Sequence, residues 1–235
     1  MKLFVLFIAL SMFCLTASGQ ARGVGGKVLN YQQHDTRTYH FGFCIGLNVM
    51  NFDITHSHSN YSVDSLRASV TNLSPGFHIQ AVTAARLTDN LEVRLLPGVA
   101  FGHRELSFYK DNQLYSVSQI LESSYITLPL LLKYKSVRIN NYRPYMTGGL
   151  NPRFDLARTY REDDDIYMDL KLLDLCYEFG AGADFYFPFF KLTVELRGSW
   201  GMFNVLNHRD VSRPEFQNAI EKLRSSVYMI SIYIE

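Results

Sequence analysis

The strongest constraint in this sequence is an alternation of apolar and polar residues that recurs along the chain. In residues 175–187 the odd positions are leucine, tyrosine, phenylalanine or alanine, whereas the even positions include Glu178, Asp184 and two glycines. A period of two is the pattern of a β-strand whose two faces meet different surroundings. Seven other segments are candidates for the same structure, namely residues 40–53, 76–87, 91–108, 122–135, 142–158, 191–202 and 225–235. We therefore predict eight strands.

A segment of a different kind precedes these strands. Lys2 supplies a positive charge, residues 3–15 are almost all apolar, and the small residues Ala17 and Gly19 suit cleavage before Gln20. These are the parts of a secretory signal, so we predict that residues 1–19 are removed on export. A retained helical anchor is disfavoured because a spanning helix needs about 20 apolar residues. Residues 20–39 then form a periplasmic segment ahead of the first strand, and residues 40–235 form one domain.

The mature chain would have to enter a membrane as strands, because no second run of about 18 apolar residues follows the leader. The predicted strands are long enough, since a tilted spanning strand needs about 9 to 11 residues. A soluble lipocalin-like barrel also alternates, but with its apolar side chains inside. The interior of an eight-stranded barrel has no room for Tyr177, Phe179, Trp200 and their equivalents. We predict an all-β fold, an eight-stranded antiparallel transmembrane β-barrel whose apolar faces meet lipid.

The connections between the predicted strands differ in length. Residues 87–90, 136–141 and 188–189 are short joints, whereas residues 53–74, 109–121, 159–171 and 206–224 are long. Outer-membrane barrels keep short turns in the periplasm and longer loops outside the cell. This pattern predicts an outer-membrane location, short periplasmic turns, long extracellular loops and both chain ends in the periplasm. In the last long loop, the spacing of Pro214, Phe216, Ile220 and Leu223 predicts a short helix.

The polar faces of the predicted strands carry charges of both signs. They hold Glu92, Arg94, Lys133, Arg143, Arg153, Glu178, Asp184, Glu195 and Arg197. Charges enclosed in a narrow barrel must pair, because an unpaired buried charge is very costly. We predict a network of ion pairs that plugs the interior. An open ion path is the disfavoured alternative, since eight strands leave little free bore.

Charge and cysteine content constrain the partners and the redox chemistry. One of the 23 basic residues, Lys2, lies in the leader, so the exported chain carries 22 basic and 22 acidic residues. This balance provides no basic field for nucleic acid, and the expected surroundings are outer-membrane lipid. Cys44 and Cys176 fall in the first and sixth predicted strands. Those strands are not neighbours in an eight-stranded barrel, so two buried free thiols are favoured over a disulfide.

Motifs for catalysis or metal binding are weak. His56 and His58 form a His-x-His pair without a third ligand nearby, and residues 162–165 lack the spaced oxygen ligands of a calcium loop. His78 is predicted to point inward and His103 outward, so the two would not share one catalytic site. The sequence contains no Gly-x-Ser-x-Gly elbow and no phosphate loop. We predict no enzyme activity, no cofactor and no metal.

Several segments, in their order along the chain, resemble a known family. They are His40-Phe41-Gly42-Phe43 leading to Gly46-Leu47-Asn48, Leu128-Pro129-Leu130 with Lys133-Tyr134-Lys135, Arg143-Pro144-Tyr145 with Gly148-Gly149, and Tyr177-Glu178-Phe179-Gly180 with Gly182 and Asp184. Over nearly the whole mature chain, the sequence resembles the PorT family, also called SprT, of type IX secretion proteins. The segment from Asn30 to Tyr39 resembles this family's periplasmic lead-in. One departure from many outer-membrane barrels is that the last residue is Glu235 and not an aromatic.

The resemblance implies a membrane-embedded accessory component needed for type IX secretion, and for gliding motility in bacteria that glide. It implies other type IX secretion components as partners, and it implies no catalytic residues. A plugged barrel cannot pass a folded cargo, so such a protein is expected to act by contact through its lead-in, its short turns or its loops. The alternative is a generic surface barrel whose extracellular loops bind a ligand or mediate adhesion.

Overall fold

The computed structural model describes residues 29–31, 37–56, 66–110, 113–156, 169–207 and 220–235. The predicted leader, residues 1–19, and most of the following segment to residue 39 lie outside the described residues. All regular structure in the described part of the chain is β-strand, and every pairing is antiparallel. No helix within those ranges is long and apolar enough to cross a membrane.

Eleven strands form one sheet, and they lie in eight runs along the chain, three of which consist of two strands each. The runs are β1 (Tyr39–His56), β2 (Leu66–Leu73) with β3 (Pro75–Arg86), β4 (Leu91–Leu95) with β5 (Gly98–Lys110), β6 (Gln113–Thr127) with β7 (Leu130–Lys135), β8 (Tyr142–Asp155), β10 (Leu173–Tyr186), β11 (Lys191–Gly201) and β13 (Ile220–Ile234). Two runs are interrupted at Pro97 and Pro129, where proline has no N–H to donate to the ladder. Two short strands, β9 (Asp169–Leu170) and β12 (Leu206–Asn207), pair with each other.

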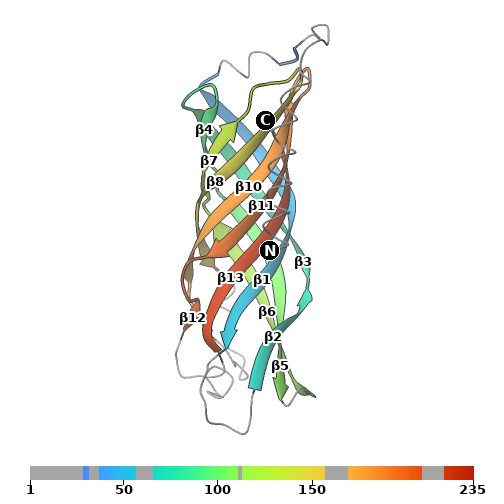
Figure 1. Cartoon of the computed structure of the whole chain (residues 1–235), viewed down its shortest axis with the longest axis vertical. Coiled ribbons are helices and arrows are strands. Elements are labelled where there is room, and N and C mark those ends of the chain that lie inside the picture. Colours follow the sequence, from blue (N-terminus) through green and yellow to red (C-terminus); the bar gives the residue numbers. More distant parts are fainter. Residues whose placement is uncertain (1–28, 32–36, 57–65, 111–112, 157–168, 208–219) are drawn as a thin grey trace, which may run out of the picture.

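The sheet closes on itself because each run pairs with the runs before and after it. β1 pairs with β3 on one side and with β13, the last run, on the other, where Phe43 lies opposite Ile234. The other neighbours follow chain order, including β8 against β10 and β11 against β13. Figure 1 shows the resulting tall ring of strands. A closed ring has no open sheet edge, which is what strands in lipid require.

Each of the eight predicted segments falls in one of these runs, and the predicted all-β antiparallel fold is confirmed. The predicted long loop over residues 109–121 is wrong, because β5 continues to Lys110 and β6 already begins at Gln113. Backbone pairing extends these strands beyond the apolar alternation, since ladder hydrogen bonds do not depend on side-chain polarity. The predicted helix is also wrong where the structure describes it, because Ile220 and Leu223 belong to β13. Residues 214 and 216 lie outside the described ranges.

The short turns lie at one end of the barrel, and the C-terminus lies at the same end (Figure 1). In the first short turn, the Leu87 N–H donates to the Leu91 carbonyl at 2.9 Å. In the second, Asn140 has a φ of 54°, a left-handed conformation that asparagine tolerates better than most residues. β1 also begins at this end, since Tyr39 lies opposite Ala85 beside the first turn. The first and last strands therefore share the short-turn end.

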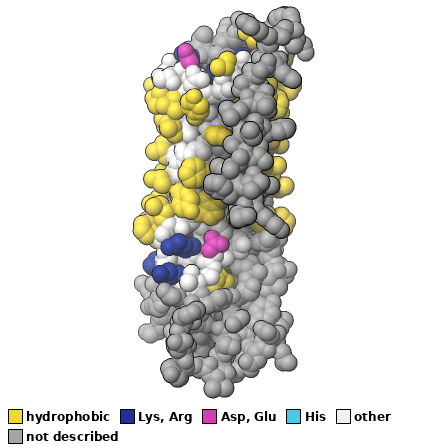
Figure 2. Space-filling model, in the orientation of Figure 1, with side chains coloured by type: hydrophobic (Ala, Val, Ile, Leu, Met, Phe, Trp, Pro, Cys, Tyr) yellow, Lys and Arg dark blue, Asp and Glu magenta, His cyan; other side chains and the backbone are white. Residues whose placement is uncertain are grey.

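Large apolar side chains cover the outer surface of the half of the barrel nearest the short turns. On β1 they are Tyr39, Phe41, Phe43, Ile45 and Leu47, each more than half exposed. Figure 2 shows this apolar belt, and it shows acidic and basic side chains where the belt ends toward the long loops. On β1 and β13 the outward positions beyond the belt include Asp53 and Arg224, which lie opposite each other. Such a belt matches the lipid-facing band of outer-membrane barrels, which is about 25 Å tall.

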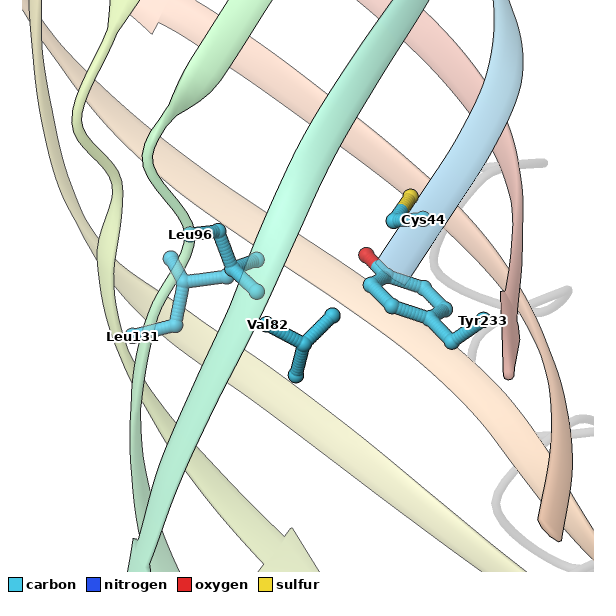
Figure 3. Packing of buried hydrophobic residues seen from close by; sticks show 5 residues of the cluster. All are labelled: Cys44, Val82, Leu96, Leu131 and Tyr233. Atoms are coloured by element: carbon cyan, nitrogen blue, oxygen red, sulfur yellow. The ribbon is translucent and has the colours of Figure 1, made fainter. Parts of the chain in front are cut away.

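Apolar side chains also meet inside the ring, in two small clusters. One cluster consists of Cys44, Val82, Leu96, Leu131 and Tyr233, which converge from five different runs (Figure 3). The other consists of Met50, Ala100, Tyr125, Val227 and Met229. Because the side chains in each cluster come from several walls, they occupy the bore of the barrel at these levels.

Candidate functional site

The charged residues of the strands line the interior of the barrel. Eight of the nine predicted lumen residues are almost fully buried, namely Glu92, Arg94, Lys133, Arg153, Glu178, Asp184, Glu195 and Arg197. The strand alternation directs them inward because their neighbours along each strand face lipid. Each of the eight belongs to at least one ion pair with a buried partner.

One part of this network lies beside the short turns and includes the last residue of the chain. The Arg94 Nε donates to Glu92 Oε1 at 2.8 Å, and its Nη2 donates to Glu235 Oε1 at 2.7 Å. The Lys135 Nζ donates to Glu92 Oε2 at 2.9 Å, and the Lys191 Nζ donates to Glu235 Oε2 at 2.6 Å. The terminal glutamate therefore links β4 to β11 inside the barrel, which gives this non-aromatic last residue a structural role.

A second part of the network surrounds an inward-facing tyrosine. The Lys133 Nζ lies 2.8 Å from both Asp184 oxygens and 3.7 Å from the centre of the Tyr145 ring, a cation–π contact. The Tyr145 hydroxyl donates to Glu195 Oε2 at 2.7 Å. A Cβ at Gly182 would lie 2.6 Å from the Tyr145 hydroxyl oxygen. Glycine at this inward position therefore makes the room that the tyrosine occupies.

The third part of the network is centred on Arg197. Its Nη1 donates to Glu178 Oε2 at 3.1 Å, and its Nη2 donates to Gln80 Oε1 and the Tyr233 hydroxyl at 3.1 Å each. Its Nε lies 3.3 Å from Glu195 Oε1, which also accepts from the Tyr233 hydroxyl at 2.7 Å. The guanidinium is thus held between two carboxylates, as a buried cation requires.

The carboxylate of Glu178 is shared between two arginines. Besides Arg197, it lies 3.4 Å from Arg153 Nη2, and it accepts a hydrogen bond from Asn151 Nδ2 at 2.7 Å. Arg153 also donates to the Ser199 hydroxyl. These contacts join β8, β10 and β11 inside the barrel, and the hydrogen bond from Arg153 to Ser199 links β8 to β11, which the backbone ladder does not pair directly.

Arg143, the ninth predicted lumen residue, is only partly buried, unlike the other eight. Its Cα pairs with that of Asp184 in the β8–β10 ladder. Its guanidinium instead reaches the short-turn rim, where Nε donates to the Ser136 carbonyl at 2.8 Å and Nη2 to the Asp89 carbonyl at 3.2 Å. Arg143 is the second residue of β8, close enough to solvent for its long side chain to keep the charge at the rim and avoid burial.

The sequence prediction also omitted several buried polar residues of the interior. The main ones are Arg104, Lys135, Tyr145, Lys191 and Tyr233, together with the side chain of Glu235. Alternation indicates Lys135 and Lys191, because they share strand faces with Lys133 and Glu195. Tyr145 and Tyr233 gave no such signal, because an inward tyrosine looks like a lipid-facing aromatic when only hydrophobicity is read.

The histidines do not form a catalytic pair. His78 is fully buried, whereas His103 is exposed on the outer face of β5. In the described part of the chain, no three His, Cys, Asp or Glu side chains are grouped to hold a metal ion. The candidate metal residues His58 and 162–165 lie outside the described residues.

The two cysteines of the predicted mature chain are buried and free. The Cys44 Sγ lies 3.9 Å from His78 Nε2, and the Cys176 thiol donates to Asp174 Oδ2 at 3.3 Å. They lie in β1 and β10, which are not neighbours in the ring. The sequence-based prediction of free thiols is confirmed.

The short-turn rim holds part of the segment that precedes the barrel. The Arg138 guanidinium donates to the Asn140 carbonyl at 2.7 Å, to Asn141 Oδ1 at 2.9 Å and to the Asn30 carbonyl at 2.5 Å. It also stacks on the Tyr186 ring, 3.8 Å from the ring centre. The Asn30 N–H donates to Asn141 Oδ1 at 2.9 Å, and its Nδ2 donates to the Tyr186 carbonyl at 3.2 Å. We call these five residues the rim clamp.

The same segment meets the barrel a second time on the opposite wall. There the Arg86 N–H donates to the Thr38 carbonyl at 2.8 Å, just before β1 begins. The rim clamp lies at β8 and β10, which are the fifth and sixth runs of the ring, whereas Thr38 lies at the first and second runs. The segment ahead of the first strand is therefore fixed to the barrel on two sides of the short-turn mouth.

Comparison with known proteins places this architecture in a family. The family described as "Outer membrane protein beta-barrel domain" matches residues 30–207. No curated protein matches the chain. Among solved structures, the outer membrane protein OprG from Pseudomonas aeruginosa is similar with a TM-score of 0.47 and 14% identity, over 84% of this chain and 92% of that one.

Two further solved structures are similar over most of their length. The outer membrane protein AlkL in DMPC lipid bilayers has a TM-score of 0.40 and 13% identity, over 91% of this chain and 92% of that one. Ail, the attachment invasion locus protein of Yersinia pestis, has a TM-score of 0.36 and 12% identity, over 85% of this chain and 99% of that one.

Proposed function

The chain belongs to the family of outer-membrane β-barrel domain proteins, and from this premise we propose that it is a non-catalytic component of type IX secretion. It acts by protein contacts from the outer membrane, and in gliding bacteria it also supports motility. The sequence resemblance to the PorT family supplies the secretion role. The filled interior is the observation that carries the contact mechanism.

Within the described part of the chain, the interior leaves no bore for an exported protein. Along the barrel axis, ion pairs occupy the interior from the short turns as far as Arg153. The two apolar clusters, which contain Leu131 and Tyr125, fill further parts of it. An eight-stranded barrel is only just wide enough for such side chains. Opening a path would require several buried ion pairs to be broken, at about 3 to 5 kcal/mol for each pair that loses one partner. Cargo therefore passes elsewhere, and this barrel contributes surfaces.

The proposed contact surface is the short-turn rim, with the N-terminal segment that the rim clamp holds. In the proposed orientation this rim and both chain ends face the periplasm, as short turns do in outer-membrane barrels. The rim presents exposed apolar side chains at Val137, Ile139 and Phe189 beside the Arg138 clamp. Other type IX secretion components would meet this rim from the periplasm.

A deletion with complementation tests the secretion role. In a strain with a clean in-frame deletion of the gene, we expect type IX cargo to accumulate in the periplasm, and we expect the wild-type gene to restore its surface location. Normal export in the deletion strain, together with an altered surface phenotype, would contradict the proposal and favour the generic loop-binding barrel.

Two matched variants then test whether the rim is the contact surface. Arg138→Ala removes the centre of the rim clamp, whereas Arg224→Ala removes an exposed arginine from the other end of the apolar belt. Provided both variants reach the outer membrane at the wild-type level, we expect export to fall with Arg138→Ala alone. Equal export by the two variants would argue against contact through the clamped segment.

A further inference from the structure

A small cavity inside the barrel is lined on one side by the apolar cluster of Met50, Ala100, Tyr125, Val227 and Met229 and on the other by polar side chains that include Arg153. Its volume is about 10 Å³. Asn48 of β1, His78 and Gln80 of β3, Tyr125 of β6 and Arg153 of β8 are among the lining residues. A water molecule needs a cavity of about 10 to 15 Å³ on this measure. The cavity therefore has room for one water molecule.

Several polar atoms of the residues that line this cavity lack a hydrogen-bond partner among the described residues. They are Oδ1 and Nδ2 of Asn48, Nδ1 of His78 and Nη1 of Arg153. All three side chains are at least 97% buried. Leaving a buried polar group unsatisfied costs about 1 to 3 kcal/mol, and more when the group is charged. Three such side chains around one cavity indicate a shared ligand that satisfies them.

The chemistry of these atoms selects the ligand. The Asn48 Oδ1 accepts hydrogen bonds, and Nδ1 of His78 accepts one in the tautomer whose Nε2 donates to the Ser231 hydroxyl, 2.9 Å away. The Arg153 Nη1 donates. A ligand that donates twice and accepts once is a water molecule, and about three hydrogen bonds is the usual number for a buried water. A halide accepts only and would leave the Asn48 oxygen unsatisfied.

We propose that this cavity is a binding site for one structural water molecule, which donates to Asn48 and His78 and accepts from Arg153. The site joins opposite walls, because β1 is the first run of the ring and β8 is the fifth. Elsewhere on β1, the Cys44 Sγ lies 3.9 Å from His78 Nε2. The water ties β1 to Arg153, and through Arg153 to Glu178.

The first test is a crystal structure of the mature, detergent-solubilised protein at a resolution that shows ordered waters. We expect one peak within hydrogen-bonding distance of Asn48, His78 and Arg153. A cavity without density, or a direct hydrogen bond between Asn48 and Arg153, would overturn the proposal. Crystals soaked in bromide must show no anomalous peak there, because such a peak would identify an anion site.

The second test compares two substitutions of buried polar residues and does not depend on crystals. Asn48→Leu keeps the branched shape and the number of side-chain heavy atoms but removes a partner of the water, so the groups of His78 and Arg153 lose their bridge. Thr147→Val removes a buried hydroxyl that also lacks a partner but does not line the cavity. We measure the temperature at which the fast-migrating folded band on a gel converts to the slow one.

The sign of the temperature shift separates a hydrated cavity from a dry one. With water bound, Asn48→Leu lowers the conversion temperature by several degrees, whereas Thr147→Val leaves it unchanged or raises it. In a dry cavity, Asn48→Leu would remove two unsatisfied atoms and raise the conversion temperature, which would overturn the proposal. If Asn48→Leu yields no folded band, the crystal structure of the wild-type protein decides.

Discussion

The Lys133 Nζ lies 2.8 Å from both carboxylate oxygens of Asp184, with both side chains fully buried. The lysine projects from β7 and the aspartate from β10, so the ion pair passes over β8, which lies between those strands. Such a pair holds the wall together from the inside, in addition to the backbone ladder. Removing one partner should therefore lower the free energy of unfolding of the barrel.

Replacing Lys133 by methionine should destabilise the barrel by about 3 to 5 kcal/mol, because Asp184 would remain as a buried charge without its main cation. Urea unfolding in lipid vesicles, followed by the fluorescence of the single tryptophan, Trp200, measures the change. Adding Asp184→Leu should recover part of the loss. Lys171→Met is the control, because Lys171 is exposed and should contribute at most about 1 kcal/mol. Equal effects of the two lysine variants would contradict the buried network.

A charge placed on the lipid-facing side should be costly in the middle of the belt and not at its edge. Val194 lies on β11 between Leu192 and Leu196, on the outward face. We expect Val194→Arg to cost about 2 to 4 kcal/mol if it meets the bilayer midplane. Thr55→Arg, at an exposed position of β1 beyond Asp53, should cost only about 0 to 1 kcal/mol. The same vesicle unfolding assay tests both, and a neutral Val194→Arg would reverse our assignment of the two faces.

Replacing the last residue, Glu235, should lower the free energy of unfolding as much as replacing a buried charge within a strand. Glu235→Gln removes the carboxylate that Arg94 and Lys191 share, so Lys191 loses its ion-pair partner inside the barrel. We expect a loss of about 3 to 5 kcal/mol in the free energy of unfolding in vesicles. The control is Asp53→Asn, an exposed acid that should contribute at most about 1 kcal/mol. Unfolding that is insensitive to Glu235→Gln would show that the terminal glutamate is dispensable.

The two thiols of the predicted mature chain should be unreactive while the barrel is folded. Both sulfur-bearing side chains are fully buried and free. A maleimide should label neither Cys44 nor Cys176 before unfolding, and both after unfolding in detergent at high temperature. Mobility on a gel should be the same with and without reductant. Labelling of the folded protein would mean that the interior opens to reagents of this size.

This unreactive background allows a test of the proposed orientation. Val137→Cys places a thiol at the short-turn rim, and Thr55→Cys places one beyond the other edge of the belt. In intact cells, a maleimide that does not cross the outer membrane should label Thr55→Cys and not Val137→Cys. After cell disruption it should label both. The opposite pattern would place the short turns outside the cell.

The sequence was sufficient to locate the eight strands and to decide which face meets lipid. Both follow from local information, because side chains alternate with a period of two and the volume of an eight-stranded interior is fixed. Reading the alternation further would also have found Lys135 and Lys191. The outer ends of β5 and β6 could not be located in this way, because apolar alternation ends there while backbone pairing continues.

Only the tertiary structure decided which charges meet. Arg94 and Glu235 are 141 residues apart, and their contact depends on how the first and last runs are staggered when the ring closes. The sequence pattern does not contain that stagger. The sequence pattern also did not indicate that the Arg143 side chain would turn to the rim, although its Cα pairs with that of Asp184 on the adjacent strand. Whether such a side chain enters the lumen or reaches solvent depends on how far the residue lies from the end of the barrel. The alternation of residues determined the barrel wall, and closure of the ring determined its interior.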